Sequence, residues 1–80
     1  MKVLFYGRLA ESIAAEVEVD ALPGSSIAQL RERLMANYPE AGQSLRSRRS
    51  RACVGDTLVS DDHLLEATDT VEFLPPVSGG

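Results

Sequence analysis

Two apolar segments lie near the ends of the chain, and each has apolar residues on both faces of a strand. Residues 3–6 read Val-Leu-Phe-Tyr and residues 70–74 read Thr-Val-Glu-Phe-Leu. Alternation places Val71 and Phe73 on one face, with Glu72 and Leu74 on the other. Strands that are apolar on both faces suit the middle of a sheet, so the first and last strands are expected to be central.

Three further segments predict shorter strands. Residues 17–22 alternate apolar and polar side chains, with Val17, Val19 and Leu22 on one face. Residues 52–54 and 57–59 are apolar runs joined by Gly55-Asp56. A glycine in the first position of a two-residue connection predicts a hairpin with a type II′ turn.

One helix is predicted after Ser26. Ser26 and Gln29 match a capping box, in which a serine and a glutamine satisfy the first free amides of a helix. Apolar residues then recur on one face at Ile27, Leu30, Leu34 and Tyr38, while Arg31, Glu32 and Arg33 are expected to face elsewhere. Pro39 disfavours helical geometry at the residue before it and ends the element.

The order of these elements predicts an α+β fold in which one main helix packs on one face of a small mixed sheet, a β-grasp arrangement. Residues 9–15 are expected to form a turn or so of helix, residues 40–50 a polar loop, and residues 60–65 a turn or short helix. The β-grasp domain is expected to span residues 1–74, followed by an extended tail at residues 75–80.

Length and composition fit a single small globular domain. The chain has 80 residues, of which 44% are hydrophobic and 25% charged, with a net charge of −4. Its one cysteine, Cys53, has no partner for an internal disulfide. Since no apolar run reaches the length of a signal peptide or a membrane span, a cytoplasmic protein without membrane contact is predicted.

The sequence contains few of the residue combinations that commonly form catalytic or ligand-binding sites. Cys53 and His63 are the only candidates for a thiol-imidazole pair, and nothing in the sequence brings them together. The run Ser-Asp-Asp-His at residues 60–63 fits a solvated turn better than a metal site, because consecutive residues rarely converge on one ion. Residues 23–27 lack the glycine spacing and the lysine of a phosphate-binding loop, so no nucleotide site is expected.

The basic charge is confined to the first part of the chain. All eight basic residues lie within residues 1–51, and four of them fall in Arg-Ser-Arg-Arg-Ser-Arg at residues 46–51. Residues 52–80 hold six acids and no base. One basic loop on an acidic domain is a poor match for nucleic acid, whereas the acidic C-terminal part suits a basic protein partner.

The C-terminal tail is the segment best suited to chemistry. Two prolines hold a chain extended and exclude helix and sheet interior, and the residues after them are small: the tail reads Pro75, Pro76, Val77, Ser78, Gly79 and Gly80. Such a thin peptide fits a narrow channel in another protein. The Gly80 carboxylate needs prior activation for acyl transfer, most simply as a mixed anhydride with AMP made by a partner that binds ATP.

The sequence resembles the small subunits of molybdopterin synthase, a family of ubiquitin-like β-grasp sulfur carriers. The likeness covers essentially the whole chain. Its most specific part is the ending Phe-x-Pro-Pro-Val-Ser-Gly-Gly, which runs from Phe73 to Gly80. The chain departs from the family at Gly55, where asparagine is frequent, and at residues 67–70, where an Asp-Gly-Asp turn is usual.

The resemblance implies a specific reaction sequence. Gly80, preceded by Gly79, would be adenylated by an E1-like enzyme that uses ATP, converted to a thiocarboxylate by a persulfide donor, and inserted into the large synthase subunit. There it would give sulfur to cyclic pyranopterin monophosphate, within a heterotetramer of two small and two large subunits. The chain itself would bind no cofactor and would not be an enzyme alone. The tail residues 75–78 and three residues of the domain would contact partners: Tyr6, Leu58 and Leu74.

Three alternatives remain open. The sulfur carrier of thiamin thiazole synthesis has the same fold and the same Gly-Gly end, but it generally lacks the two prolines. A ubiquitin-like protein modifier would use Gly80 to form an isopeptide bond with lysines. An interaction module with an unused tail would need neither kind of chemistry.

Overall fold

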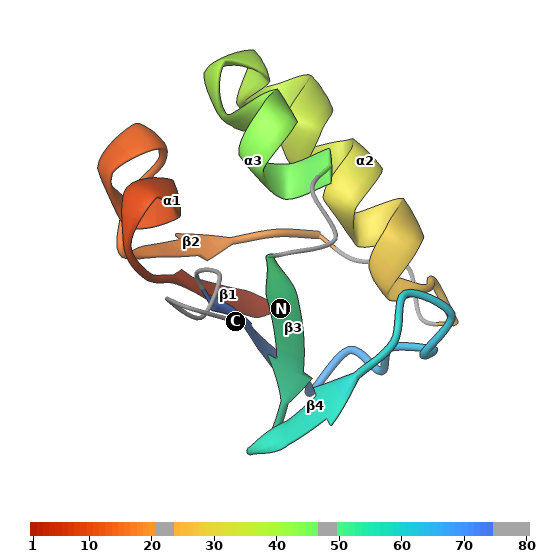
Figure 1. The fold of residues 1–80 in the computed structure, drawn as a ribbon. Coiled ribbons are helices and arrows are strands. Elements are labelled where there is room, and N and C mark those ends of the chain that lie inside the picture. Colours follow the sequence, from red (N-terminus) through yellow and green to blue (C-terminus); the bar gives the residue numbers. More distant parts are fainter. Residues whose placement is uncertain (21–23, 47–49, 75–80) are drawn as a thin grey trace.

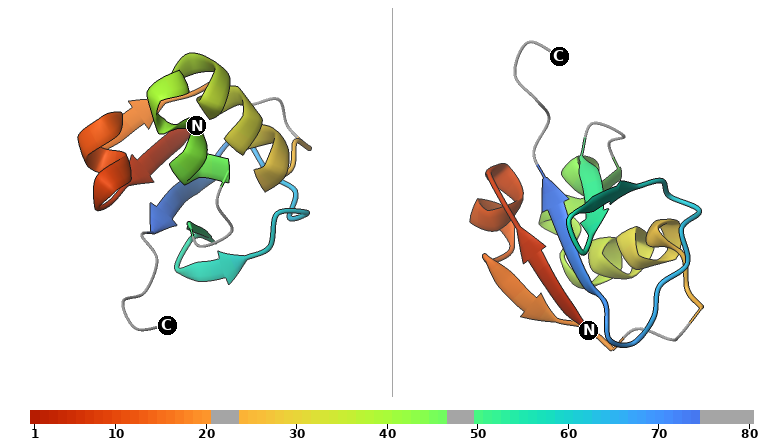
Figure 2. Two further views of the ribbon diagram at one scale, coloured as in Figure 1. Left: turned by 45° about the horizontal axis from the view of Figure 1, so that its top comes forward. Right: turned by 90° about the horizontal axis from the view of Figure 1, so that it is seen from below.

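The computed structural model describes residues 1–20, 24–46 and 50–74. A five-stranded sheet carries helices on one side, and no helix formed by these described residues lies on the other side (Figures 1 and 2). The elements in chain order are β1 (Lys2–Phe5), α1 (Arg8–Ser12), β2 (Glu16–Glu18), α2 (Ile27–Asn37), the 3-10 turn η1 (Pro39–Ala41), α3 (Gly42–Arg46), β3 (Arg51–Val54), β4 (Thr57–Val59) and β5 (Thr70–Leu74).

The first and last strands lie side by side in the sheet, as predicted. The strand order is β2-β1-β5-β3-β4, so β5 is the middle strand. β1 and β5 run parallel, with Val3 opposite Val71 and Phe5 opposite Phe73, and all other pairs are antiparallel. The parallel pair requires a crossover, and the whole chain from α1 to β4 supplies it.

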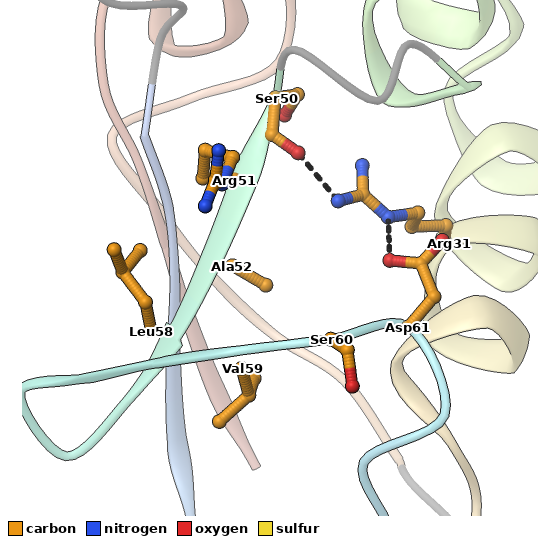
Figure 3. A pocket seen from close by; sticks show the side chains of 8 residues that line it. All are labelled: Arg31, Ser50, Arg51, Ala52, Leu58, Val59, Ser60 and Asp61. Carbon is orange, nitrogen blue, oxygen red and sulfur yellow. Dashed lines mark hydrogen bonds and ion pairs between the residues drawn. The ribbon is translucent and has the colours of Figure 1, made fainter.

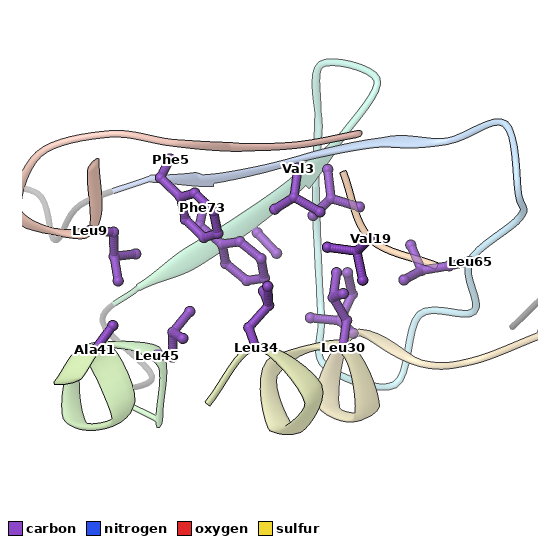
Figure 4. Packing of buried hydrophobic residues seen from close by; sticks show 13 residues of the cluster. Val3, Phe5, Leu9, Val19, Leu30, Leu34, Ala41, Leu45, Leu65 and Phe73 are labelled. Carbon is purple, nitrogen blue, oxygen red and sulfur yellow. The ribbon is translucent and has the colours of Figure 1, made fainter. Parts of the chain in front are cut away.

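The hydrophobic core lies between the sheet and the helices (Figure 4). Phe5 and Phe73 stack with ring centroids 5.8 Å apart and an angle of 12° between the ring planes. Val71 and Phe73 are fully buried, which confirms that they face α2. The predicted helical stripe is likewise confirmed, because Ile27, Leu30 and Leu34 are all buried.

The start of α2 follows the predicted capping box. Ser26 is the N-cap, and its side-chain oxygen accepts a hydrogen bond from the amide of Gln29 at 3.2 Å. The Gln29 side chain accepts the Ser26 amide in return at 2.8 Å. Each bond satisfies a backbone donor that has no partner within the helix.

The prediction of a polar loop at residues 40–50 was wrong for most of that segment. Residues 39–46 form η1 and α3, which fold back against α2. Ala41 and Leu45 are buried in the core at 1% and 0% exposure. Their spacing of four residues is helical, and the burial of these two side chains outweighs the loop propensity of the glycine and serine residues around them.

Two boundary details also differ from prediction. Gly55 and Asp56 both have positive φ, at 51° and 69°, which is the pattern of a type I′ turn and not of type II′. Aspartate tolerates this conformation, and type I′ matches the twist of the flanking strands. The strand predicted at residues 17–22 is observed as β2, which ends at Glu18 because its partner β1 begins at Lys2. Val19 still exchanges hydrogen bonds with Met1. Leu22 lies outside the described residues.

Arg31 was expected to face away from the core, yet it is only 6% exposed. It lies four residues after Ile27, so it falls on the apolar face of α2. Its guanidinium donates to the carbonyl of Leu45 at 2.7 Å. It also donates to the carbonyl of Ser50 and to the Asp61 carboxylate, the latter at 3.1 Å (Figure 3). The guanidinium also lies 5.0 Å from the centre of the Phe73 ring. One buried cation therefore connects α2, α3, β3, β5 and the segment after β4.

Replacement of Arg31 by Met is expected to lower the free energy of unfolding by about 2–4 kcal/mol, because two buried carbonyls lose a charged donor and Asp61 loses its cation. Urea denaturation followed by circular dichroism measures the change. The matched control is Arg33→Met on the exposed side of α2, which should stay within about 0.5 kcal/mol of the parent. Equal stabilities for the two variants would contradict the role given to Arg31.

Candidate functional site

The helix-free face of the sheet brings together the side chains that do not enter the core. The cross-strand register aligns one row of five residues over all five strands: Glu16, Leu4, Glu72, Cys53 and Leu58. Since opposite residues in a sheet share a face, the whole row lies on the side away from α2. Figure 2 (right) shows this side, with β1, β5 and β3 running side by side.

The three domain residues predicted to contact partners lie on or beside this row. Leu58 is 54% exposed and stands opposite Cys53, and Tyr6, which directly follows β1, is 41% exposed. Leu74 is half-buried at the end of β5, opposite Arg51 of β3. The structure thus confirms that these residues share one face, and their contact with a partner stays a prediction.

An acid lies within this face, between β1, which leads into Tyr6, and β4, which carries Leu58. Glu72 is half-buried, and its Oε2 atom accepts a hydrogen bond from the Tyr6 hydroxyl at 2.7 Å. This hydrogen bond, together with the nearby negative charge, raises the pKa of Tyr6, since both favour the protonated phenol. The pair places a charged group between Leu4 and Cys53, which stand opposite Glu72 on the two neighbouring strands.

Glu72→Gln is expected to lower the pKa of Tyr6, because the negative charge beside the phenol is removed. The chain has two tyrosines, so the titration is followed by tyrosinate absorbance in a Tyr38→Phe background. Because the pKa of Tyr6 is raised in the folded state, the hydrogen bond stabilises the fold fully at pH values below the ordinary tyrosine pKa. This stabilisation is lost as the pH rises through the pKa of Tyr6 in the folded protein. Identical Tyr6 titrations with and without the Glu72 carboxylate would contradict the assignment.

Cys53 is 8% exposed although it faces the helix-free side. Burial raises the pKa of its thiol, and the negative charges of Glu72 and Asp56 act in the same direction, with Arg51 opposing them. Cys53 is thus a small, buried side chain within the short strand β3. A protonated, covered thiol is a weak nucleophile.

The reaction of Cys53 with a disulfide reagent at neutral pH should be on the order of tenfold or more slower in the native protein than in urea, because the thiolate is disfavoured and covered. The absorbance of the released thiolate measures both rates, and free cysteine provides the reference. Equal rates in the two states would show that the thiol is accessible and reactive in the fold.

A pocket of about 470 Å³ lies on the helix side of β3 and β4 (Figure 3). Arg31, Ser50 and Asp61 line it together with residues of β3 and β4. The hydrogen bonds of Arg31 to Leu45, Ser50 and Asp61 engage each of its three nitrogens within the protein. This cation therefore serves the fold, and the pocket adds no candidate site.

The predicted tail residues, Pro75 to Gly80, lie outside the described residues. Residues 47–49, within the arginine-rich segment at residues 46–51, also lie outside the described residues. Over the part of the chain that is described, no three His, Cys, Asp or Glu side chains are placed to share a metal ion. A search of the same residues finds no helix long and apolar enough to cross a membrane.

Sequence reasoning missed two groups that shape this region. Arg31 follows Ile27 by one helical turn, so the i, i+3, i+4, i+7 pattern would have shown that it lies on the buried face. Glu72 was assigned to the correct face, but the sequence could not show that Tyr6 hydrogen-bonds to it. That contact depends on the parallel register of β1 and β5, which joins residues 66 positions apart.

Comparisons with known proteins agree with the predicted fold and family. The model of the ThiS family matches residues 3–80. The molybdopterin synthase sulfur carrier subunit of Escherichia coli (strain K12) is 34% identical over 80 residues, which cover 100% of this chain and 99% of that protein.

Two solved structures share the fold, and their low identities limit that likeness to the fold alone. The putative molybdopterin converting factor, subunit 1, of Pyrococcus furiosus has a TM-score of 0.79 at 21% identity and 95% coverage of both chains. The small archaeal modifier protein 1 of Haloferax volcanii has a TM-score of 0.81 at 17% identity, again with 95% coverage of both chains. The predicted ubiquitin-like β-grasp fold is confirmed.

Proposed function

Because this chain belongs to the ThiS family, we propose that it is the sulfur carrier subunit of a molybdopterin synthase. The observation that carries the proposal is the match to the E. coli carrier subunit, at 34% identity over the full length of both chains. The chain ends in Pro-Pro-Val-Ser-Gly-Gly, which suits a carrier whose C-terminal carboxylate is the working group.

The proposed chemistry takes place at Gly80. An E1-like partner uses ATP to convert the terminal carboxylate to an acyl adenylate, with release of pyrophosphate. The terminal sulfur of a persulfide donor then displaces AMP and forms an acyl disulfide. A second thiol cleaves the S–S bond, which releases the thiocarboxylate and leaves a disulfide between the two thiol sulfurs. Insertion of Gly79 and Gly80 into the large subunit presents that sulfur to cyclic pyranopterin monophosphate, and two carriers serve each product in a heterotetramer.

The sheet supports this role by fixing the origin of the tail. Residues 75–80 follow Leu74, the last residue of β5, and β5 is held by hydrogen-bonded ladders to β1 on one side and β3 on the other. Phe73, one residue before Leu74, is fully buried and stacked on Phe5. The attachment point of the reactive end is therefore rigid.

The helix-free face supplies a docking surface next to that origin. Tyr6 and Leu58 are exposed, and Leu74 shares their face at the end of β5. Exposed apolar side chains gathered on one side of a small protein are typical of an interaction site. We assign this face to the large subunit and to the activating enzyme, with Pro75 to Ser78 continuing the contact.

The remaining parts of the proposal follow from this assignment. The chain acts as a sulfur-donating subunit and not as an enzyme by itself, and it binds no cofactor of its own because the activating partner holds ATP. Its site of action is the cytoplasm, where its partners and their substrates would meet it. Neither nucleic acid nor a membrane takes part.

The test is reconstitution with purified large subunit, activating enzyme and persulfide donor. Intact mass spectrometry should show one terminal oxygen replaced by sulfur, and molybdopterin should form when cyclic pyranopterin monophosphate is added. Deletion of Gly80, or one added residue after it, should abolish both signals and leave binding to the large subunit intact, since the domain makes the other contacts.

The matched control is Cys53→Ala, which should keep full activity because the transferred sulfur never resides on that thiol. Loss of transfer in this variant would assign the chemistry to Cys53. Isopeptide adducts on lysines of many proteins would instead support the modifier alternative. A thiocarboxylate that serves thiazole formation and not molybdopterin synthesis would support the thiamin alternative.

A further inference from the structure

Glu72 occupies the centre of the helix-free face. It belongs to β5, the middle strand of five, and Leu4 and Cys53 stand opposite it on the two neighbouring strands. Leu58 lies beyond Cys53 on β4. A partner that covers Leu58, Leu74 and Tyr6 together therefore has to cover Glu72 as well.

Among residues 1–20, 24–46 and 50–74, one hydrogen bond and no ion pair reach the Glu72 carboxylate. Oε2 accepts from the Tyr6 hydroxyl. Within the described ranges, the cations that pair with acids are the Met1 amino group with Glu18, Lys2 with Glu16, and Arg31 with Asp61. Arg51 stands diagonally across from Glu72, opposite Leu74, and forms no ion pair with it among these contacts.

Burial of this carboxylate against an apolar surface would be unfavourable. A charged group taken out of water costs several kcal/mol unless a partner donates hydrogen bonds or carries the opposite charge. The Tyr6 hydroxyl satisfies part of Oε2 only, which leaves Oε1 for an incoming donor. The same bond holds the carboxylate in one orientation before the partner arrives.

We propose that Glu72, oriented by Tyr6, determines which proteins dock on the helix-free face: the partner places an arginine or lysine side chain from an otherwise apolar surface against this carboxylate. The inference rests on the proposed function, since it describes the chemistry of the carrier's docking face. β4, β5 and the segment between them carry acids and no lysine or arginine, which favours a cation there. Lys2 and Arg51 stand diagonally across from Glu72 on the neighbouring strands. An opposing surface that is wholly apolar or acidic is rejected, because Glu72 is then buried without a counter-ion.

The experiment measures the dissociation constant of the full-length carrier for the large synthase subunit of the same organism by titration calorimetry, at low and at high salt. Glu72→Gln keeps the shape and removes the charge, and it should weaken binding at least about tenfold and flatten the salt dependence. Tyr6→Phe keeps the ring and should weaken binding about threefold to tenfold, since one hydrogen bond that orients the carboxylate is lost.

The matched control is Glu16→Gln, which removes the same charge from the same cross-strand row at the edge strand β2. It should change affinity less than about twofold, because Glu16 is exposed and already faces Lys2. Thermal unfolding of each variant separates lost folding from lost binding, and a purely structural role for Glu72 would leave the salt dependence unchanged.

The outcomes separate the two proposals. If the parent carrier binds the large subunit and transfers sulfur, and Glu72→Gln binds equally well or more tightly, the inference is overturned and the proposed function stands. Parent carrier that does not bind the large subunit overturns both. Weaker binding in Glu72→Gln with a flatter salt dependence, together with an unchanged Glu16→Gln, supports the inference.

Discussion

The parallel pairing of β1 with β5 is the constraint on which the rest of the structure depends. It joins the two ends of the chain in the middle of the sheet, with Phe5 stacked on Phe73 beneath the ladder. This pairing gives β5 two neighbours, which fixes the strand that precedes the tail. It also sets the register that brings Tyr6 to Glu72 on the opposite face. Core, tail origin and docking face therefore follow from one ladder.

Arg31 and Glu72, the two charged groups whose contacts the sequence did not predict, differ in how far the protein satisfies their hydrogen bonds. Arg31 is buried and fully engaged by the protein's own carbonyls and by Asp61, so it stabilises the arrangement of α2, α3 and β3. Glu72 is half-buried with a single hydrogen bond from Tyr6, so it keeps acceptor capacity for another molecule. A buried charge that is satisfied contributes to the fold, whereas a partly satisfied one at the surface contributes to recognition.

The sequence predicted those features that local pattern determines. Alternation in residues 70–74 identified the buried Val71 and Phe73, and the Ser26–Gln29 capping box marked the start of α2. The helix at residues 42–46 was not predicted, because Leu45 gains its burial only when the segment folds back on α2. The positive φ of Asp56 was missed for a similar reason, since strand twist selects the turn type. The site residues on the helix-free face could be named, but their mutual contacts required the register.

The central position of β5 has a mechanical consequence for a carrier that enters and leaves its partners by its end. A pull on the chain beyond Leu74 acts along β5 and loads the ladders to β1 and β3 in shear. Many hydrogen bonds then resist together, instead of opening one at a time as they would at an edge strand that is peeled away. Under the proposed function, this arrangement favours withdrawal of the domain by its terminus with the sheet intact through repeated cycles of loading and discharge.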